Sequence, residues 1–373
     1  MLIRKEKLEI LLIKGGEAVF SCETKIETGI SHLKELHIQK LLLVTDPYFV
    51  SDGTAQRLLT LSGAAQTAVF DKIAPDPTVE LVAEGTAVLK DFQPDTVVAL
   101  GGGSAMDCAK AMAYFAGERP RLVMIPTTSG SGSEVTNFAV LTRGTVKYPL
   151  VDEKLRPDVA ILEDSLLKSL PKSLIADAGF DVLGHALEAY TAKNANGFTD
   201  ALASGAFATV LTKLPDSFSG NTAVRGQIHE ASTMAGMAFT QAGLGLCHAM
   251  AHVLGATYHI PHGRLIAMLL PPVIACNAPG CMEKYAALAR SAGLGGTADT
   301  MAVRNLRNAI VRLRKELQMP TCLKAAGVDP QRVWQDREKL VSSVLEDPCC
   351  DTNPLIPDRT MICEILEAVT DNG

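Results

Sequence analysis

The sequence lacks an excess of positive charge, a CxxC cysteine pair and a long apolar run near its start. Its 373 residues carry a formal net charge of −6 at pH 7. A nucleic-acid surface usually needs clustered lysine and arginine, so the charge argues against a nucleic-acid partner. The one basic cluster, "RLRKEL" (312–317), alternates in charge at helical spacing, which predicts a solvent-exposed helix face.

The missing cysteine pairs and apolar runs bear on the compartment. The apolar run within residues 1–16 is too short for a signal sequence or a membrane span, so no membrane partner is expected. We expect the nine scattered cysteines to be reduced thiols in a cytoplasmic compartment. "LEILLI" (8–13) is predicted as a first sheet strand, with a targeting helix as the alternative.

The hydrophobic pattern changes near residue 174. Before it, short apolar runs at 40–46, 66–73, 95–103 and 121–132 alternate with helical patterns at 79–92 and 105–117. This alternation predicts a doubly wound parallel sheet, whose ligands bind at the carboxyl ends of the strands. After it, every pattern has helical spacing. We therefore predict an α/β domain over 1–174 and an all-α domain over 175–373, with the active site in the cleft between them.

A glycine-rich loop, "GGGSAMD" (101–107), joins a predicted strand to a predicted helix. Glycines allow a tight turn and close approach of a diphosphate, and the helix N-terminus adds N–H donors. The loop is not GxGxxG, because Met106 stands at the third glycine position. A tight turn without a ligand is the alternative.

Two further features favour a dinucleotide. Asp46 ends the run 40–46, where a carboxylate accepts hydrogen bonds from ribose hydroxyls and repels a 2′-phosphate, which favours NAD over NADP. A turn before Pro47 is the alternative for Asp46. The second feature is "PTTSGSGSE" (126–134), a hydroxyl-rich loop free of bulky side chains that can contact phosphate or ribose.

Two pairs of metal-ligand residues have helical i, i+4 spacing. Asp181 and His185 share one helix face, as do His248 and His252. His262 follows in "PHG", a predicted turn. Imidazoles with one carboxylate and no thiolate suit Fe(II) or Zn(II). These five exceed four protein ligands, so one histidine is predicted to transfer protons, and spacing does not choose between His248 and His252.

Other polar residues near these pairs are less informative. Glu188 lies on the same helix face as Asp181. We expect His259 to lie outside the metal site, and the sequence offers no partner for His229.

Together these residues resemble the iron-containing (type III) alcohol dehydrogenase family. The matching stretches spread over nearly the whole chain, and they are "GGGSAMDCAKA", "PTTSGSGSEVTNFAV", "DAGFDVLGHALEAY", "GMAFTQAGLGLCHAMAHVLGATYHIPHG" and "DPCCDTNPLIP". Within the family the motifs are similar to those of the 1-propanol dehydrogenases of propanediol-utilising bacterial microcompartments, and nearly as similar to those of ethanolamine-utilisation alcohol dehydrogenases. The resemblance implies a dehydroquinate-synthase-like fold, with an NAD-binding α/β domain followed by a helical metal domain.

The resemblance also implies roles for single residues. The metal ligands would be Asp181, His185, His248 and His262. His252 would lie near the nicotinamide and act in catalysis. The cofactor contacts would be Asp46, Gly102, Gly103, Ser104, Asp107, Thr127, Thr128, Thr136 and Lys147.

The expected reaction is reversible hydride transfer between NAD(H) and a short aldehyde or primary alcohol, with propionaldehyde and 1-propanol as the expected pair. Fe(II) is the expected metal, and the same ligands accept Zn(II). The resemblance further implies a homo-oligomer, a dimer or larger, and a place among the shell and lumen proteins of a microcompartment. The rivals are a polyol (glycerol-type) dehydrogenase, a metal-dependent lyase or hydrolase, and a scaffold without activity.

Overall fold

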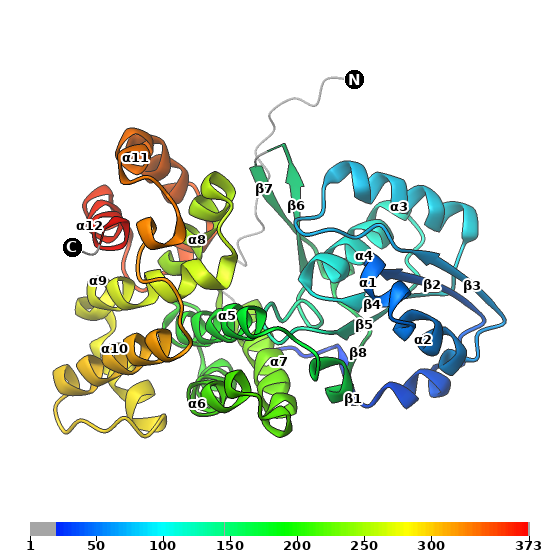
Figure 1. The fold of residues 1–373 in the computed structure, drawn as a ribbon, viewed down its shortest axis with the longest axis horizontal. Coiled ribbons are helices and arrows are strands. Elements are labelled where there is room, and N and C mark those ends of the chain that lie inside the picture. Colours follow the sequence, from blue (N-terminus) through cyan, green and yellow to red (C-terminus); the bar gives the residue numbers. More distant parts are fainter. Residues whose placement is uncertain (1–19, 145, 372–373) are drawn as a thin grey trace.

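The computed structural model describes residues 20–144 and 146–371, so the predicted strand at 8–13 lies outside the described residues. Its first half is built on a parallel sheet in the order β1-β8-β5-β4-β2-β3 (Figure 1). The strands are β1 (Lys25–Thr28), β2 (Lys40–Thr45), β3 (Gln66–Phe70), β4 (Thr96–Gly101), β5 (Arg121–Pro126) and β8 (Val159–Leu162).

Side chains alternate between the two faces of this sheet. Leu42 and Val44 of β2 pack toward α3 and α4, whereas Leu41 and Leu43 pack toward α2 and η1. The helices of this half are η1 (Ile30–Leu36), α1 (Pro47–Ser51), α2 (Thr54–Ser62), α3 (Val79–Phe92), α4 (Gly103–Ala116), η2 (Glu153–Leu155) and η3 (Asp164–Leu167). Burial on both faces explains the continuous apolar runs and confirms the predicted doubly wound sheet.

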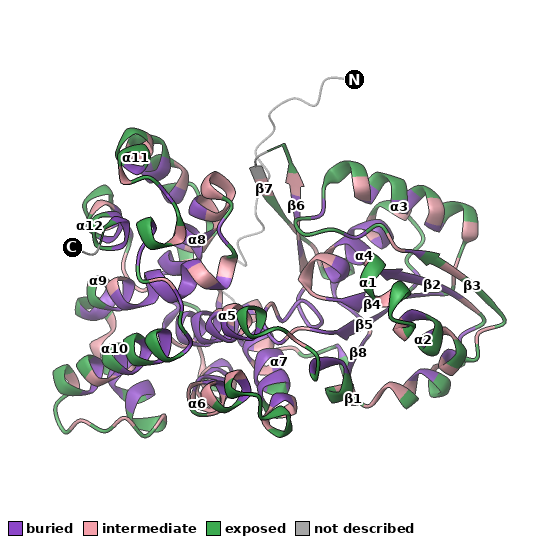
Figure 2. Cartoon of the chain, viewed as in Figure 1, coloured by how far each residue is buried: buried purple, intermediate pink, exposed green. Residues whose placement is uncertain are grey.

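The second half is helical throughout the part that the structure describes. Its elements are α5 (Lys172–Thr191), α6 (Gly197–Ser219), η4 (Thr222–Val224), α7 (Arg225–Ala242), α8 (Leu246–Tyr258), α9 (His262–Ser291), α10 (Asp299–Glu316), η5 (Lys324–Ala326), α11 (Pro330–Leu345), η6 (Pro348–Thr352) and α12 (Arg359–Thr370). Their inward faces form one buried core around α5, α8 and α9 (Figure 2). The all-α prediction for this half is confirmed.

Three local predictions need correction. An antiparallel ribbon of β6 (Phe138–Arg143) and β7 (Val146–Val151) was not predicted. His262 begins α9, with Pro261 as its N-cap, and does not lie in a turn. Arg314, within the predicted exposed face of 312–317, is 8% exposed and donates to the carbonyl oxygen of Ala267.

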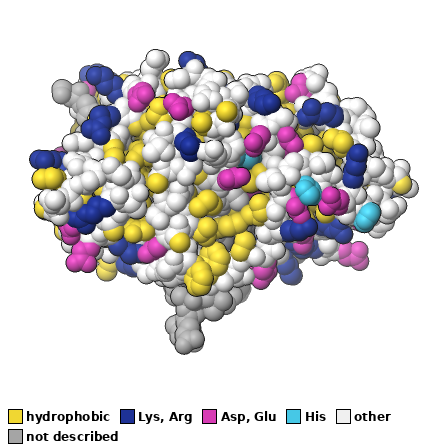
Figure 3. All heavy atoms as spheres, turned by 90° about the horizontal axis from the view of Figure 1, so that it is seen from below, with side chains coloured by type: hydrophobic (Ala, Val, Ile, Leu, Met, Phe, Trp, Pro, Cys, Tyr) yellow, Lys and Arg dark blue, Asp and Glu magenta, His cyan; other side chains and the backbone are white. Residues whose placement is uncertain are grey.

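The outer surface carries charges of both signs. On the face seen from below, acidic and basic side chains are interspersed and apolar side chains gather across the middle (Figure 3). Among the described helices, α9 alone is long and apolar enough to cross a membrane, but 61% of its apolar window is buried inside the protein. That burial is typical of a core helix.

Candidate metal and cofactor site

Three helices bring the predicted metal ligands together. Asp181 and His185 come from α5, His248 from α8, and His262 from the first position of α9. Ligand atoms of Asp181, His248 and His262 lie within 4.8 Å of one another. The ring of His185 stacks on that of His248, with the centroids 4.5 Å apart. The i, i+4 pairs thus face each other across the α5–α8 contact.

The imidazoles are arranged with one nitrogen bonded to protein and the other left for a ligand. Nδ1 of His248 lies 2.6 Å from Oε2 of Glu188, and Nδ1 of His262 lies 2.7 Å from Oδ1 of Asp181. Nε2 of His248 and Nε2 of His262 are buried without a hydrogen-bond partner among the described residues. Metal-binding histidines characteristically donate their second N–H to a carboxylate or carbonyl, so these residues fit a divalent cation.

His185 follows the same pattern through the backbone. Its Nδ1 lies 3.2 Å from the carbonyl oxygen of Gly130. A carbonyl oxygen accepts only, so Nδ1 carries the hydrogen and Nε2 keeps its lone pair. Gly130 belongs to the hydroxyl-rich loop, which therefore contacts the candidate metal ligand His185 and also contains the predicted cofactor contacts Thr127 and Thr128.

The protonation states suit a cation. Burial lowers the pKa of His185 to about 3 and holds the pKa of His248 well below its usual value. Burial alone would raise the pKa of Asp181, but the adjacent His185 and His262 hold it below its usual range. Neutral imidazoles beside an ionised carboxylate are the forms that bind Fe(II) or Zn(II).

Glu188 has a different role from the one its helix face suggests. Its carboxylate accepts from the backbone N–H groups of Gly245, Cys247 and His248, at 3.0, 2.7 and 3.3 Å. It thus caps α8 from outside and also bonds the ring of His248. A carboxylate at a helix N-terminus is favourable because it satisfies free N–H donors. The sequence signal was an acid three positions after His185 in a helical pattern.

The geometry separates His248 from His252, which spacing alone left open. His248 is 1% exposed, whereas the His252 side chain is 31% exposed and its Nδ1 lies 2.9 Å from Oδ2 of Asp347. The His252 ring centroid is 5.4 Å from that of His262. His252 therefore lies at the solvent-exposed side of the candidate metal ligands, where protons can exchange with water.

Two other histidines serve the fold. His259 is the C-cap of α8 in the left-handed conformation, at φ 56°. His229 has a partner that the sequence did not reveal, since its Nδ1 lies 2.9 Å from Oγ of Ser129.

The predicted cofactor residues lie on three neighbouring loops. Asp46 follows β2, Gly102 and Gly103 follow β4, and Thr127 and Thr128 follow β5, and these three strands are adjacent in the order β5-β4-β2. Their carboxyl ends therefore meet at one edge of the sheet. Gly102 is the N-cap of α4 and has no side chain to cap it, which leaves the helix N–H groups free for an anion.

The glycines are needed for close packing of these loops. A Cβ atom on Gly103 would lie 3.0 Å from Oγ of Ser131, and one on Gly102 would lie 3.2 Å from Oγ1 of Thr128. Asp46 caps α1 by accepting from the N–H of Tyr48 at 2.9 Å. Asp46 is therefore both the turn residue before Pro47 and a carboxylate at the sheet edge.

The remaining predicted contacts are less open. Asp107 accepts from Oγ of Ser133 and from the N–H of Val140. Thr136 is fully buried and accepts from Nζ of Lys110 at 2.9 Å. Asp107 thus holds the hydroxyl-rich loop through Ser133, and Lys110 links Thr136 to the same serine.

Ser104 and Lys147 meet at Asp76. Oγ of Ser104 accepts from the Asp76 N–H at 3.3 Å, and Nζ of Lys147 lies 2.6 Å from Oδ1 of Asp76. Lys147, on β7, is thereby tied to the loop ahead of α3.

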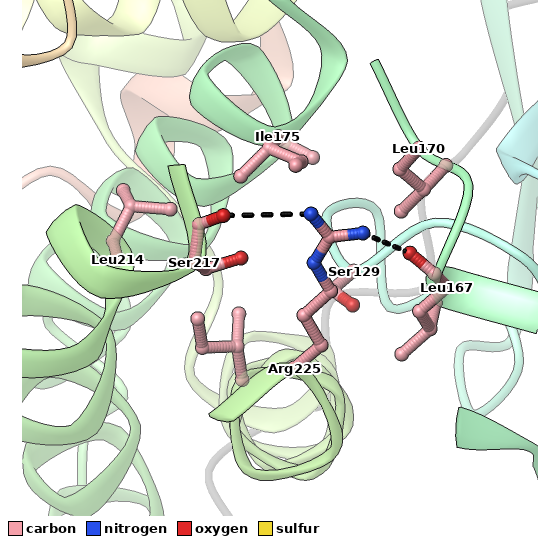
Figure 4. Close-up of a pocket in the computed structure, with 9 residues that line it drawn as sticks. Ser129, Leu167, Leu170, Ile175, Leu214, Ser217 and Arg225 are labelled. Atoms are coloured by element: carbon pink, nitrogen blue, oxygen red, sulfur yellow. Dashed lines mark hydrogen bonds between the residues drawn. The ribbon is translucent and has the colours of Figure 1, made fainter. Parts of the chain in front are cut away.

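A small cavity beside the hydroxyl-rich loop does not belong to this site. It has a volume of about 20 Å³, room for about one water molecule. The Arg225 guanidinium donates to the carbonyl oxygens of Leu167 and Ser217 beside it (Figure 4). These bonds join η3, α6 and α7, so Arg225 has a structural role there.

Known proteins are similar to this chain in sequence over most of its length. Residues 18–164 match the family described as "Iron-containing alcohol dehydrogenase", and residues 175–370 match "Fe-containing alcohol dehydrogenase family, C-terminal". The 1-propanol dehydrogenase PduQ of Citrobacter freundii is 39% identical over 366 residues, which cover 93% of this chain and 98% of that protein. The NADPH-dependent butanol dehydrogenase of Clostridium saccharobutylicum is 37% identical over 81% of this chain and 83% of its own.

Solved structures show the same fold. The iron-containing alcohol dehydrogenase of Thermococcus thioreducens is 32% identical and has a TM-score of 0.86. The match covers 94% of this chain and 99% of that protein's chain. The sulfoacetaldehyde reductase of Bifidobacterium kashiwanohense, solved in complex with NAD⁺, is 28% identical with a TM-score of 0.88 over 96% of this chain and 100% of its own. The expected dehydroquinate-synthase-like fold is thus confirmed. The chain belongs to the iron-containing alcohol dehydrogenase family and is an oxidoreductase.

Proposed function

We propose that this enzyme uses NADH to reduce short-chain aldehydes, with propionaldehyde as substrate and 1-propanol as product. The observation that carries the proposal is the convergence of Asp181, His248 and His262, with two Nε2 atoms that have no hydrogen-bond partner among the described residues. The substrate is inferred from the 39% identity to a 1-propanol dehydrogenase.

The proposed metal is a divalent cation, Fe(II) or Zn(II), held by Asp181, His185, His248 and His262. When bound, it supplies Lewis-acid polarisation of the substrate oxygen. The protein keeps the imidazoles of His185 and His248 neutral by burial, and Glu188 and Gly130 hold these two rings in place. This preorganisation means that little reordering is needed when the site fills.

The cofactor is proposed to bind along the sheet edge. The N–H groups at the start of α4 would receive the diphosphate, since Gly102 leaves them uncapped. The Asp46 carboxylate would receive the adenosine ribose hydroxyls and disfavour a 2′-phosphate. Because one relative is NADPH-dependent, NADH and NADPH should be compared directly.

His252 is proposed as the catalytic residue that supplies the proton balancing the reduction. Its ring is 31% exposed, so it can exchange protons with solvent while Nδ1 stays bonded to Asp347. Histidine suits this task because its ordinary pKa lies near neutral pH.

The test is an anaerobic NADH-oxidation assay on the apo, Fe(II)-loaded and Zn(II)-loaded enzyme. Acetaldehyde, propionaldehyde, butyraldehyde and dihydroxyacetone are compared, and the highest kcat/KM is expected for propionaldehyde with metal. The fastest turnover on dihydroxyacetone would instead indicate a polyol dehydrogenase. Equal rates in the apo and loaded protein would contradict the proposal.

The ligand assignment has its own variant. Asp181→Ala should lose bound metal, measured by elemental analysis, together with aldehyde reduction. His259→Asn, in the left-handed C-cap of α8, is the matched control and should keep both, because asparagine tolerates that conformation. An Asp181→Ala protein with full metal and full activity would refute the site.

The chain is further proposed to form a homo-oligomer and to reside in the cytoplasm within a bacterial microcompartment. Apolar side chains gathered across one face support self-association (Figure 3), and the identity to PduQ supports the location. Light scattering of the purified protein should give at least twice the chain mass of 39.6 kDa. Co-purification with shell and lumen proteins tests the location.

A further inference from the structure

His252 shares a hydrogen bond with an acid 95 residues further along the chain. Nδ1 of His252 lies 2.9 Å from Oδ2 of Asp347. The Asp347 side chain is 12% exposed, whereas that of His252 is 31% exposed. The pair therefore has a protected end at the carboxylate and a solvent-accessible end at the imidazole.

Asp347 is itself held in place by the turn that it begins. Its Oδ1 accepts from the N–H of Cys349 at 2.9 Å, which makes it the N-cap of η6. Burial would raise the pKa of Asp347, but hydrogen bonds from His252 and Cys349 hold it below its usual value. An ionised carboxylate only accepts hydrogen bonds.

The protonation of His252 follows from that restriction. A carboxylate facing Nδ1 requires Nδ1 to carry the hydrogen, so a neutral ring keeps its lone pair on Nε2. The ring nitrogen available to substrate and water is then always Nε2. We propose that Asp347 is a positioning residue that fixes the tautomer and orientation of His252 so that Nε2 exchanges the proton of the reaction. This inference rests on the proposed function of His252.

The same three residues have another chemical interpretation. Ligand atoms of His252, Asp347 and Cys349 lie within 4.8 Å of one another and could hold a metal ion. Burial, with Asp347 adjacent, raises the pKa of the Cys349 thiol well above its usual value. A metal would have to displace this thiol proton, whereas the hydrogen bond between His252 and Asp347 needs no ion, so the positioning role is favoured.

The central variant is Asp347→Asn. Asparagine is a good N-cap and can still accept from Cys349, but its amide can both donate to and accept from Nδ1 of His252. The tautomer is then no longer enforced. Asp358→Asn is the matched control, because Asp358 caps α12 by accepting from the N–H of Met361 at 2.8 Å.

Steady-state kinetics with propionaldehyde and NADH give the first measurement. We expect Asp347→Asn to lower kcat about 10- to 100-fold with less than about a threefold change in the KM for NADH. It should have no further effect on kcat in a His252→Asn background, because the two residues act as one unit. Asp358→Asn should behave as the unmodified enzyme.

Nitrogen-15 NMR of the histidine-labelled, Zn(II)-loaded enzyme gives the second measurement, which reports the tautomer of His252. The His252 signals are assigned as those lost in His252→Asn. They should show the Nδ1–H tautomer in the unmodified enzyme and a shift toward Nε2–H in Asp347→Asn, which a capping role alone would not produce.

The possible failures are distinguishable. An unmodified enzyme without aldehyde reductase activity would refute the proposed function, while the tautomer measurement would still decide the pairing. An active enzyme whose Asp347→Asn variant matches Asp358→Asn in kcat and tautomer would refute the positioning role. A second bound metal ion, lost in Asp347→Asn, would also overturn it.

Discussion

Nζ of Lys110 lies 2.9 Å from Oγ1 of Thr136, and neither side chain is reached by solvent. The same ammonium group donates to Oγ of Ser133 at 2.8 Å and to the carbonyl oxygen of Phe138 at 3.0 Å. Burial lowers the pKa of Lys110 to about 8. One lysine of α4 thus fixes the hydroxyl-rich loop, which carries the predicted cofactor contacts Thr127 and Thr128 and also bonds His185 through Gly130.

Nζ of Lys110 also lies 3.9 Å from Oδ1 of Asp107, whose side chain is 13% exposed. Lys110→Met should therefore loosen this loop and leave the Asp107 carboxylate without this cation. Breaking a buried charged pair costs about 3–5 kcal/mol, so the free energy of unfolding should fall by that order in urea denaturation. The KM for NADH should rise as the loop loses its shape. The free energy of unfolding of Lys90→Met, a change at an exposed position on α3, should stay within about 0.5 kcal/mol of that of the unmodified protein. A Lys110→Met protein as stable as that control would show that the ammonium group is not the anchor.

Asp46→Asn separates the two roles of this residue. The amide oxygen can still accept from the Tyr48 N–H and cap α1, but the negative charge that disfavours a 2′-phosphate is gone. We expect the ratio of kcat/KM for NADPH to that for NADH to rise about tenfold. Asp52→Asn, at an exposed acid that accepts from the N–H of Thr54, controls for loss of one charge. An unchanged ratio would mean that Asp46 does not face the ribose.

Glu188→Gln should weaken metal binding without removing a ligand. The carboxylate accepts N–H groups of α8 and the Nδ1–H of His248, and a glutamine amide would direct N–H groups toward some of these donors. Loss of such a partner costs about 10- to 100-fold in metal affinity, measurable by competition with a chelator. Burial raises the pKa of Glu188, so the titration belongs at pH 8, where the carboxylate is ionised. Glu346→Gln, at an exposed position, should have unchanged affinity.

His229 should make stability depend on pH. Burial lowers its pKa from 6.5 to about 4, so between these values the unfolded chain binds more protons than the folded protein. His229 therefore contributes little to the free energy of unfolding above pH 6.5. As the pH falls below that value it destabilises the folded protein, by about 2 kcal/mol at pH 5. The free energy of unfolding, measured by urea denaturation, should fall between pH 7.5 and pH 5. This fall should be smaller in His229→Gln than in the unmodified protein by about this amount. The same pH difference in both proteins would show that His229 is not buried as a neutral ring.

The sequence by itself determined the local elements and the chemistry of the ligands. The helix predicted over 79–92 is observed as α3 (Val79–Phe92), capped by Thr78, and the buried runs became parallel strands. The i, i+4 pairs on α5 and α8 fixed which side chains share a helix face. These features depend on periodicity within one segment, so residues within a few positions of each other carry the information.

The tertiary structure decided the contacts between segments. In the folded chain Glu188 accepts hydrogen bonds at the N-terminus of α8, His252 pairs with Asp347, and Gly130 contacts His185. Each pair joins residues more than 50 positions apart. No local pattern specifies such a partner, because it depends on how whole helices and loops pack. Packing also decided that His248 is buried whereas His252 stays open to solvent.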